Sequence, residues 1–159
     1  MADKQKQQQQ VGKTAKRQDY ISWDDYFMGV AMLSAMRSKD PSTQVGACLV
    51  NTKQRIIGMG YNGWVSGIPD EELPWDRDKD LPYEETKYAY VVHAEPNALL
   101  NSTGNVEGAT LYVTMAPCNE CAKLLSQAGI AHVVYLIDPY HKDAMHKAAR
   151  RIFEKKGIT

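Results

Sequence analysis

The sequence has no long apolar run, no excess of either charge and few cysteines, and each absence excludes a class of protein. No stretch approaches the roughly 20 consecutive apolar residues that span a bilayer, so we expect no membrane partner. The 19 basic and 19 acidic residues cancel, which argues against nucleic acid as a partner, because duplex-binding proteins carry a basic excess. Three cysteines, an odd count, and a glutamine-rich N-terminus unlike a signal peptide argue against a secreted disulfide framework. These features predict a cytoplasmic protein.

The 159 residues divide into a short polar tail and a single domain. Residues 1–18 are rich in Gln and Lys and contain almost nothing that could be buried, so they are expected to be disordered. A nuclear-import arm, which would allow nuclear entry, is the alternative, but the basic residues are widely dispersed. Residues 19–159 are long enough to bury the core of one domain.

The rest of the chain alternates between helix and strand patterns, which favours an α/β fold. Two β-rich segments joined by a short polar link predict a hairpin. A later strand–helix–strand run predicts two parallel strands with a right-handed crossover, the second of them buried. In chain order we expect a helix over 22–37, strands over 44–50 and 55–59, a short helix ending at 100, a strand over 109–114, a helix over 119–128, a strand over 131–137 and a helix over 142–156.

A long acidic connection covers residues 64–87. Connections of this length are either functional or disordered. Trp64, Trp75 and Tyr83 favour an ordered lid or interface, because large aromatic rings are poorly tolerated in mobile segments. The acidic side chains could hold Mg²⁺ together with an effector nucleotide, although a solvated loop is the simpler interpretation.

Two short motifs carry the chemistry: His93-Ala94-Glu95 and Pro117-Cys118-Asn-Glu-Cys121. One His and two Cys are three ligands that Zn²⁺ favours, and they leave a fourth position for water. Glu95 is placed to accept a proton from that water and to pass it on. Either motif alone is weak evidence, since a lone Cys-x-x-Cys has several explanations. Together they are the signature of zinc-dependent nucleobase deaminases.

The motifs and one further residue have predicted places in the fold. His93 and the two cysteines are expected at the starts of two helices, where the helix dipole lowers thiol pKa values and favours metal binding. Asn62 follows a predicted strand at the edge where α/β sheets usually bind ligands, although its glycine-rich surroundings are also typical of a simple turn.

Further strings extend the match beyond the signature: RSKDP at 37–41, QVGAC at 44–48, GYNG at 60–63, PCNECA at 117–122 and QAGI at 127–130. With them the chain resembles the deoxycytidylate (dCMP) deaminases of the cytidine-deaminase superfamily over nearly all of residues 20–157. The resemblance implies a three-layer α-β-α fold with a mixed sheet of four to five strands, in the order second, first, third, fourth, fifth. It also implies that dCMP is deaminated to dUMP, which supplies thymidylate synthesis.

The resemblance further implies partners and residue roles. The expected assembly is a homohexamer, activated by dCTP and inhibited by dTTP. His93, Cys118 and Cys121 would bind Zn²⁺ and Glu95 would move protons. The substrate contacts implied are Asn62 to the sugar 3′-hydroxyl, the Ala94 N–H to the pyrimidine carbonyl, Tyr140 near the base or phosphate, and Arg37 and Lys39 to a phosphate of substrate or effector. A solvated helix end is an equally good interpretation of Arg37 and Lys39.

Three departures from the family pattern stand out. Pro96 follows Glu95 where relatives usually carry Leu, and it suits a helix start. Lys142 replaces the acidic stretch that often follows Tyr140-His141. The chain also ends at Thr159, where a fifth strand normally begins, so we expect a truncated sheet.

Other functions remain open at this point. A related deaminase could act on dCTP, a free nucleoside or a tRNA adenosine. A catalytically silent nucleotide-binding partner would lack a ligand or the Glu, and neither is missing here. A structural zinc module would need a fourth protein ligand, for which Cys48 and His132 are the candidates.

Overall fold

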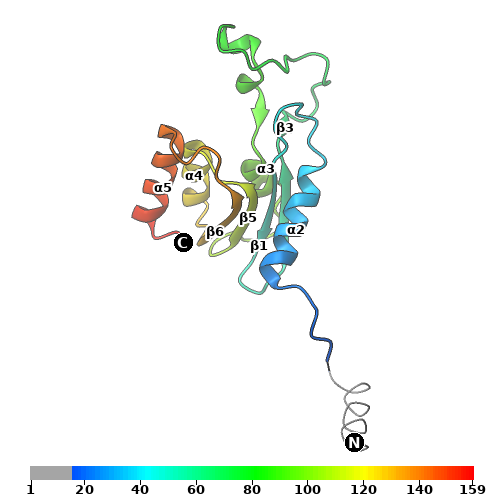
Figure 1. The fold of residues 1–159 in the computed structure, drawn as a ribbon, viewed down its shortest axis with the longest axis vertical. Helices are drawn as coiled ribbons and strands as arrows, with labels where there is room; N and C mark the ends of the chain where they lie inside the picture. The colour runs from blue at the N-terminus through cyan, green and yellow to red at the C-terminus, as the bar shows by residue number, and fades with distance from the viewer. Residues whose placement is uncertain (1–15) are drawn as a thin grey trace, which may run out of the picture.

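The computed structural model describes residues 16–159, so most of the predicted 1–18 tail lies outside the described residues (Figure 1). Two short 3₁₀ turns, η1 (Tyr83–Glu85) and η2 (Lys87–Ala89), precede β4. The remaining elements are, in chain order, α2 (Trp23–Ala35), β1 (Gly46–Val50), β2 (Ile56–Tyr61), β3 (Gly63–Trp64), β4 (Val91–Val92), α3 (Ala94–Leu100), β5 (Thr110–Met115), α4 (Asn119–Gln127), β6 (His132–Ile137) and α5 (Ala144–Lys156).

The main sheet is mixed and has four strands in the order β2-β1-β5-β6. β1 lies antiparallel to both β2 and β5, whereas β5 and β6 are parallel. This confirms the α/β class, the hairpin and the parallel pair predicted around α4. β3 and β4 form a separate antiparallel ladder that the sequence patterns did not predict.

The sheet is the middle of three layers (Figure 1). Along β1, Cys48 and Val50 pack with residues of α2 on one face, while Ala47 and Leu49 belong to the core shared with α3 and α4 on the other. Successive side chains of a strand point to opposite faces, so a strand buried on both faces is apolar throughout. α5 packs on the outside of α4 and sends Phe153 against that second core.

Two predicted features of the strands were wrong. The strand expected from residue 44 begins at Gly46, because the Val45 N–H donates to the Asn62 side chain at 2.8 Å instead of to a neighbouring strand. β6 was expected to be buried, yet Leu136 is 52% exposed. β6 is an edge strand with β5 on one side, and a short stretch around Thr159 bonds its other side, where the Val133 N–H donates to the Thr159 carbonyl at 2.8 Å.

Close packing between α3 and β2 fixes the position of His93 and Glu95. A Cβ added at Gly60 of β2 would collide with the backbone of Ala94 and Ala98 in α3. Glycine therefore permits the helix to lie directly on the strand. The start of α3, which carries both His93 and Glu95, is held against the end of β2 in this way.

The long connection between β3 and β4 packs its tryptophan rings together, whereas Tyr83 is exposed. The Trp64 ring packs on the Trp75 ring with centroids 4.2 Å apart, and Tyr90 lies edge-on to Trp64 at 6.3 Å. A role as lid or interface stays a prediction. Within residues 16–159 no helix is long and apolar enough to cross a membrane.

Candidate metal centre and active site

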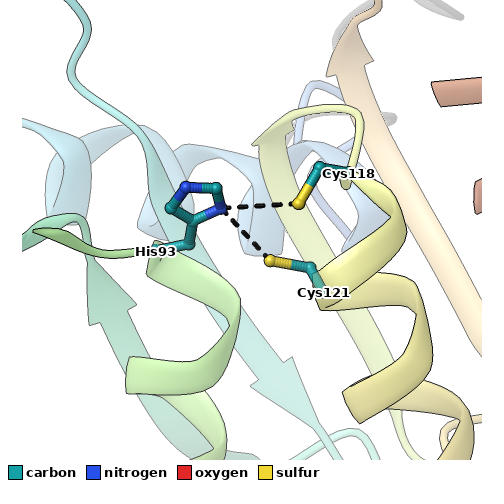
Figure 2. A group of neighbouring side chains, drawn as sticks. All are labelled: His93, Cys118 and Cys121. Carbon is teal, nitrogen blue, oxygen red and sulfur yellow. Dashed lines mark hydrogen bonds between the residues drawn. The ribbon is translucent and has the colours of Figure 1, made fainter. Parts of the chain in front are cut away.

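Three candidate ligands meet where two helices begin. His93 is the N-cap of α3 and Cys118 is the N-cap of α4, while Cys121 lies in the first turn of α4. Neither side chain forms a capping hydrogen bond with its own helix, so the imidazole and the thiol can face each other. Figure 2 shows the His93 ring directed at both sulfur atoms.

The spacing of these atoms fits zinc. His93 Nδ1 lies 3.7 Å from Cys118 Sγ and 3.3 Å from Cys121 Sγ. Zinc bonds of about 2.0–2.1 Å to nitrogen and about 2.3 Å to sulfur would separate tetrahedral neighbours by roughly 3.5–3.8 Å. The donor set and its spacing therefore match a zinc site with three protein ligands.

The alternative of a closed structural zinc site lacks its fourth ligand. Cys48 is fully buried in the core beneath α2, where burial raises the pKa of its thiol to about 12. His132 is the first residue of β6, and its ring forms a hydrogen bond with the Thr159 hydroxyl. Neither joins the group formed by the three candidate ligands within the described residues. The arrangement is that of an open, catalytic site.

The two thiols share a proton unequally. A hydrogen bond with Cys121 lowers the pKa of Cys118 to about 3, with a further contribution from His93. The same bond, together with burial, raises the pKa of Cys121. A separate hydrogen bond, between His93 and Cys118, raises the pKa of the His93 imidazole. Cys118 is thus already inclined to be a thiolate, and a divalent cation would displace the remaining proton from Cys121.

Glu95 is the second residue of α3 and is only 4% exposed. Burial raises the pKa of its carboxyl above the ordinary value, against the opposing influence of the neighbouring His93. A buried carboxyl whose pKa is shifted towards neutrality can both accept and return a proton. Glu95 therefore lies buried next to His93 with a raised carboxyl pKa, and its role as a proton shuttle stays a prediction.

Asn62 stands at the end of the β3–β4 ladder. Gly63 pairs with Val92, so the same antiparallel register places Asn62 opposite His93. Its side chain is already bonded, with Oδ1 accepting from the Val45 N–H and Nδ2 donating to the Thr43 carbonyl at 2.9 Å. Asn62 is thus beside the metal centre in a rigid orientation, and its contact with a sugar stays a prediction.

The other predicted contacts lie in two different places. Ala94 is the first residue of α3, so its N–H is one that the helix itself cannot satisfy. Tyr140 lies in the turn after β6, partly exposed, with its ring against His146 at 5.4 Å. These positions leave Ala94 beside the ligands and Tyr140 in a separate loop.

Arg37 and Lys39 line a groove of about 530 Å³ instead of the metal centre. Lys39 forms an exposed ion pair with Asp70, and that carboxylate raises the pKa of the Lys39 ammonium. Tyr61 and Trp64 also line the groove. Two cations beside aromatic rings suit an anionic ligand with a flat base.

Sequence reasoning missed a buried ion pair close to Asn62. Lys87 Nζ lies 2.7 Å and 2.6 Å from the two carboxylate oxygens of Asp40, and both side chains are almost fully buried. Burial alone raises the pKa of the Asp40 carboxyl, but bonds from Lys87 and from the backbone N–H groups of Ser42 and Thr43 bring it below the ordinary value. No local pattern marks either residue, because only the fold brings them together.

Comparison with known proteins gives one family. The model of the "Cytidine and deoxycytidylate deaminase zinc-binding region" matches residues 21–137. The chain is 52% identical to deoxycytidylate deaminase of Mus musculus and 51% identical to that of Homo sapiens, in each case covering 91% of this chain and 81% of the relative. A solved structure of dCMP deaminase from the cyanophage S-TIM5, in complex with dCMP and dUMP, superposes with a TM-score of 0.68 at 26% identity, over 87% of this chain and 96% of that one.

Proposed function

The chain belongs to the cytidine and deoxycytidylate deaminase zinc-binding family, and on that premise we propose that it is a hydrolase that deaminates dCMP. The observation that carries the proposal is the His93, Cys118 and Cys121 triad with Glu95 buried beside it. The reaction is dCMP plus water to dUMP plus ammonia. Its product would serve thymidylate synthesis.

The residues divide the work between binding and proton transfer. When held by the triad, Zn²⁺ supplies a Lewis acid that makes water acidic near neutral pH. Glu95 takes a proton as oxygen adds to the amine-bearing ring carbon, and it returns protons to the ring nitrogen and the departing amine. The Ala94 N–H would hold the pyrimidine carbonyl, and Asn62 the sugar 3′-hydroxyl. Tyr140 would approach the base or phosphate from the turn after β6.

Substrate choice is the direct test of this proposal. We expect ammonia release from dCMP with a kcat/KM at least about tenfold above that for dCTP, cytidine or a tRNA hairpin, a difference of about 1.4 kcal/mol. A coupled ammonia assay on the four compounds measures it. Turnover of another member of the panel with dCMP untouched would contradict the assignment.

Regulation by nucleotides is proposed for the groove lined by Arg37 and Lys39. Its cations and aromatic rings support a nucleotide phosphate there. We expect dCTP with Mg²⁺ to lower the apparent KM for dCMP and dTTP to raise it. Steady-state kinetics of the wild type and of the Arg37→Met variant measure this. An unchanged effector response in Arg37→Met would assign the effector to another surface.

The assembly and the compartment belong to the same proposal. A homo-oligomer, with the hexamer that the family resemblance implies, is supported by apolar side chains that remain exposed on α2 and β6, including Met32, Leu33 and Leu136. The cytoplasm suits the three free cysteines.

A further inference from the structure

The buried Lys87–Asp40 pair joins residues 47 positions apart. Their side chains are only 7% and 2% exposed, so both charges have lost their water. Apolar residues of similar volume often serve stability equally well at such positions. Apolar residues could not form directional hydrogen bonds, whereas Asp40 does.

Asp40 holds together the loop that precedes β1. Its Oδ1 accepts from the backbone N–H groups of Ser42 at 2.8 Å and Thr43 at 3.1 Å. Its Oδ2 accepts from Asn62 Nδ2 at 3.4 Å. The ammonium of Lys87 compensates the charge of this buried carboxylate, together with the bonds from the backbone.

The same loop forms hydrogen bonds with both the side chain and the backbone of Asn62. Val45 and Thr43 bond its side-chain amide, and the Ser38 hydroxyl donates to its backbone carbonyl at 2.8 Å. The β3–β4 ladder pairs Gly63 with Val92, which are the chain neighbours of Asn62 and His93. The geometry of the loop therefore sets where Asn62 stands relative to the metal centre.

Lys87 lies in the connection between β3 and β4. Its backbone N–H donates to the Asp76 carbonyl at 2.8 Å, and its carbonyl accepts from the Tyr90 N–H at 3.0 Å. Both bonds lie within the connection, so its own backbone bonding sets the position from which the ammonium reaches Asp40. A displaced connection would withdraw the cation and free the loop.

We propose that Lys87 is a positioning residue, which acts through Asp40 to hold Asn62 in the orientation that binds the nucleotide sugar. This rests on the proposed function, in which Asn62 contacts the 3′-hydroxyl. Lys87 acts on nucleotide binding and leaves proton transfer by Glu95 intact.

Two variants test the role. Lys87→Met leaves a buried carboxylate without its cation and is expected to lower the melting temperature, so the double variant carries the functional test. The double variant Lys87→Met with Asp40→Asn removes both charges and keeps an acceptor for the Ser42 and Thr43 N–H groups, so it is expected to melt close to wild type. It places an amide NH2 group where Oδ2 accepted from Asn62 Nδ2, so the bond that holds Asn62 to residue 40 is lost. We expect the double variant to show a KM for dCMP raised by about tenfold with kcat changed less than about threefold. A wild-type KM in that variant would overturn the proposal.

Hydrogen exchange provides a readout that needs no substrate. We expect the peptide covering residues 41–46, which includes the Val45 N–H bonded to Asn62, to exchange faster in the double variant. The matched control is Lys123→Met, which removes a lysine from an exposed pair with Glu120 and should change neither exchange nor KM. Unchanged exchange in the double variant overturns the positioning role. A wild type that fails to deaminate dCMP would instead refute the proposed function.

Discussion

Replacing Glu95 by Gln is expected to lower kcat by about 10²–10⁴-fold, because the amide cannot accept or return a proton. Gln keeps the size of the side chain, and the three metal ligands are untouched, so the zinc content should stay at that of the wild type. The expected result is a folded zinc protein that binds dCMP and turns it over very slowly. Steady-state kinetics and elemental analysis of the same preparation measure both quantities.

Stability should move in the opposite direction to activity. Burial raises the pKa of the Glu95 carboxyl, so the folded state favours its protonated form and ionisation near neutral pH costs stability. Gln removes that cost, and the melting temperature should be equal or higher. The control is Glu154→Gln on the exposed side of α5, which should leave kcat unchanged. Full turnover in Glu95→Gln would remove Glu95 from the mechanism.

The chemistry of this chain could be predicted from its sequence because it depends on local spacing. His93 and Glu95 are two residues apart, and Cys118 and Cys121 lie within one helical turn, so each motif keeps its geometry wherever the fold places it. The fold needed only to bring the two helix starts together, which the combined zinc motif required. The triad is accordingly where the motifs predicted it.

The supporting interactions could not be predicted because they join distant residues. Asp40 appeared only within the RSKDP string at 37–41, and Lys87 only as the last residue of the acidic connection. Their pairing depends on a 3₁₀ turn and a two-residue ladder, neither of which has a hydrophobic period to recognise. The exposure of β6 was missed for a different reason, since the apolar pattern of a strand does not show whether a helix covers its face.

Replacing Cys121 by Ser is expected to abolish both zinc retention and activity. The hydroxyl is a poor zinc ligand at neutral pH, because it does not ionise as a thiol does. The loss of affinity should exceed the roughly 10–100-fold that follows from removing a residue that only supports a ligand. Zinc per chain after dialysis, and turnover with and without added Zn²⁺, measure the change. Added zinc should also stabilise the wild type against heat far more than the variant.

Cys48→Ala separates ligand loss from the general cost of losing a buried thiol. Cys48 is fully buried between β1 and α2, and desolvation keeps it protonated, so it has no part in holding the metal. The substitution leaves a small cavity, which should cost about 1 kcal/mol of unfolding free energy while zinc content and turnover stay at wild-type values. If Cys48→Ala lost zinc as readily as Cys121→Ser, zinc retention would depend on core packing and not on the Cys121 thiol in particular. Retention of zinc and activity by Cys121→Ser would instead exclude this thiol as a ligand and leave the site with too few donors for the proposed chemistry.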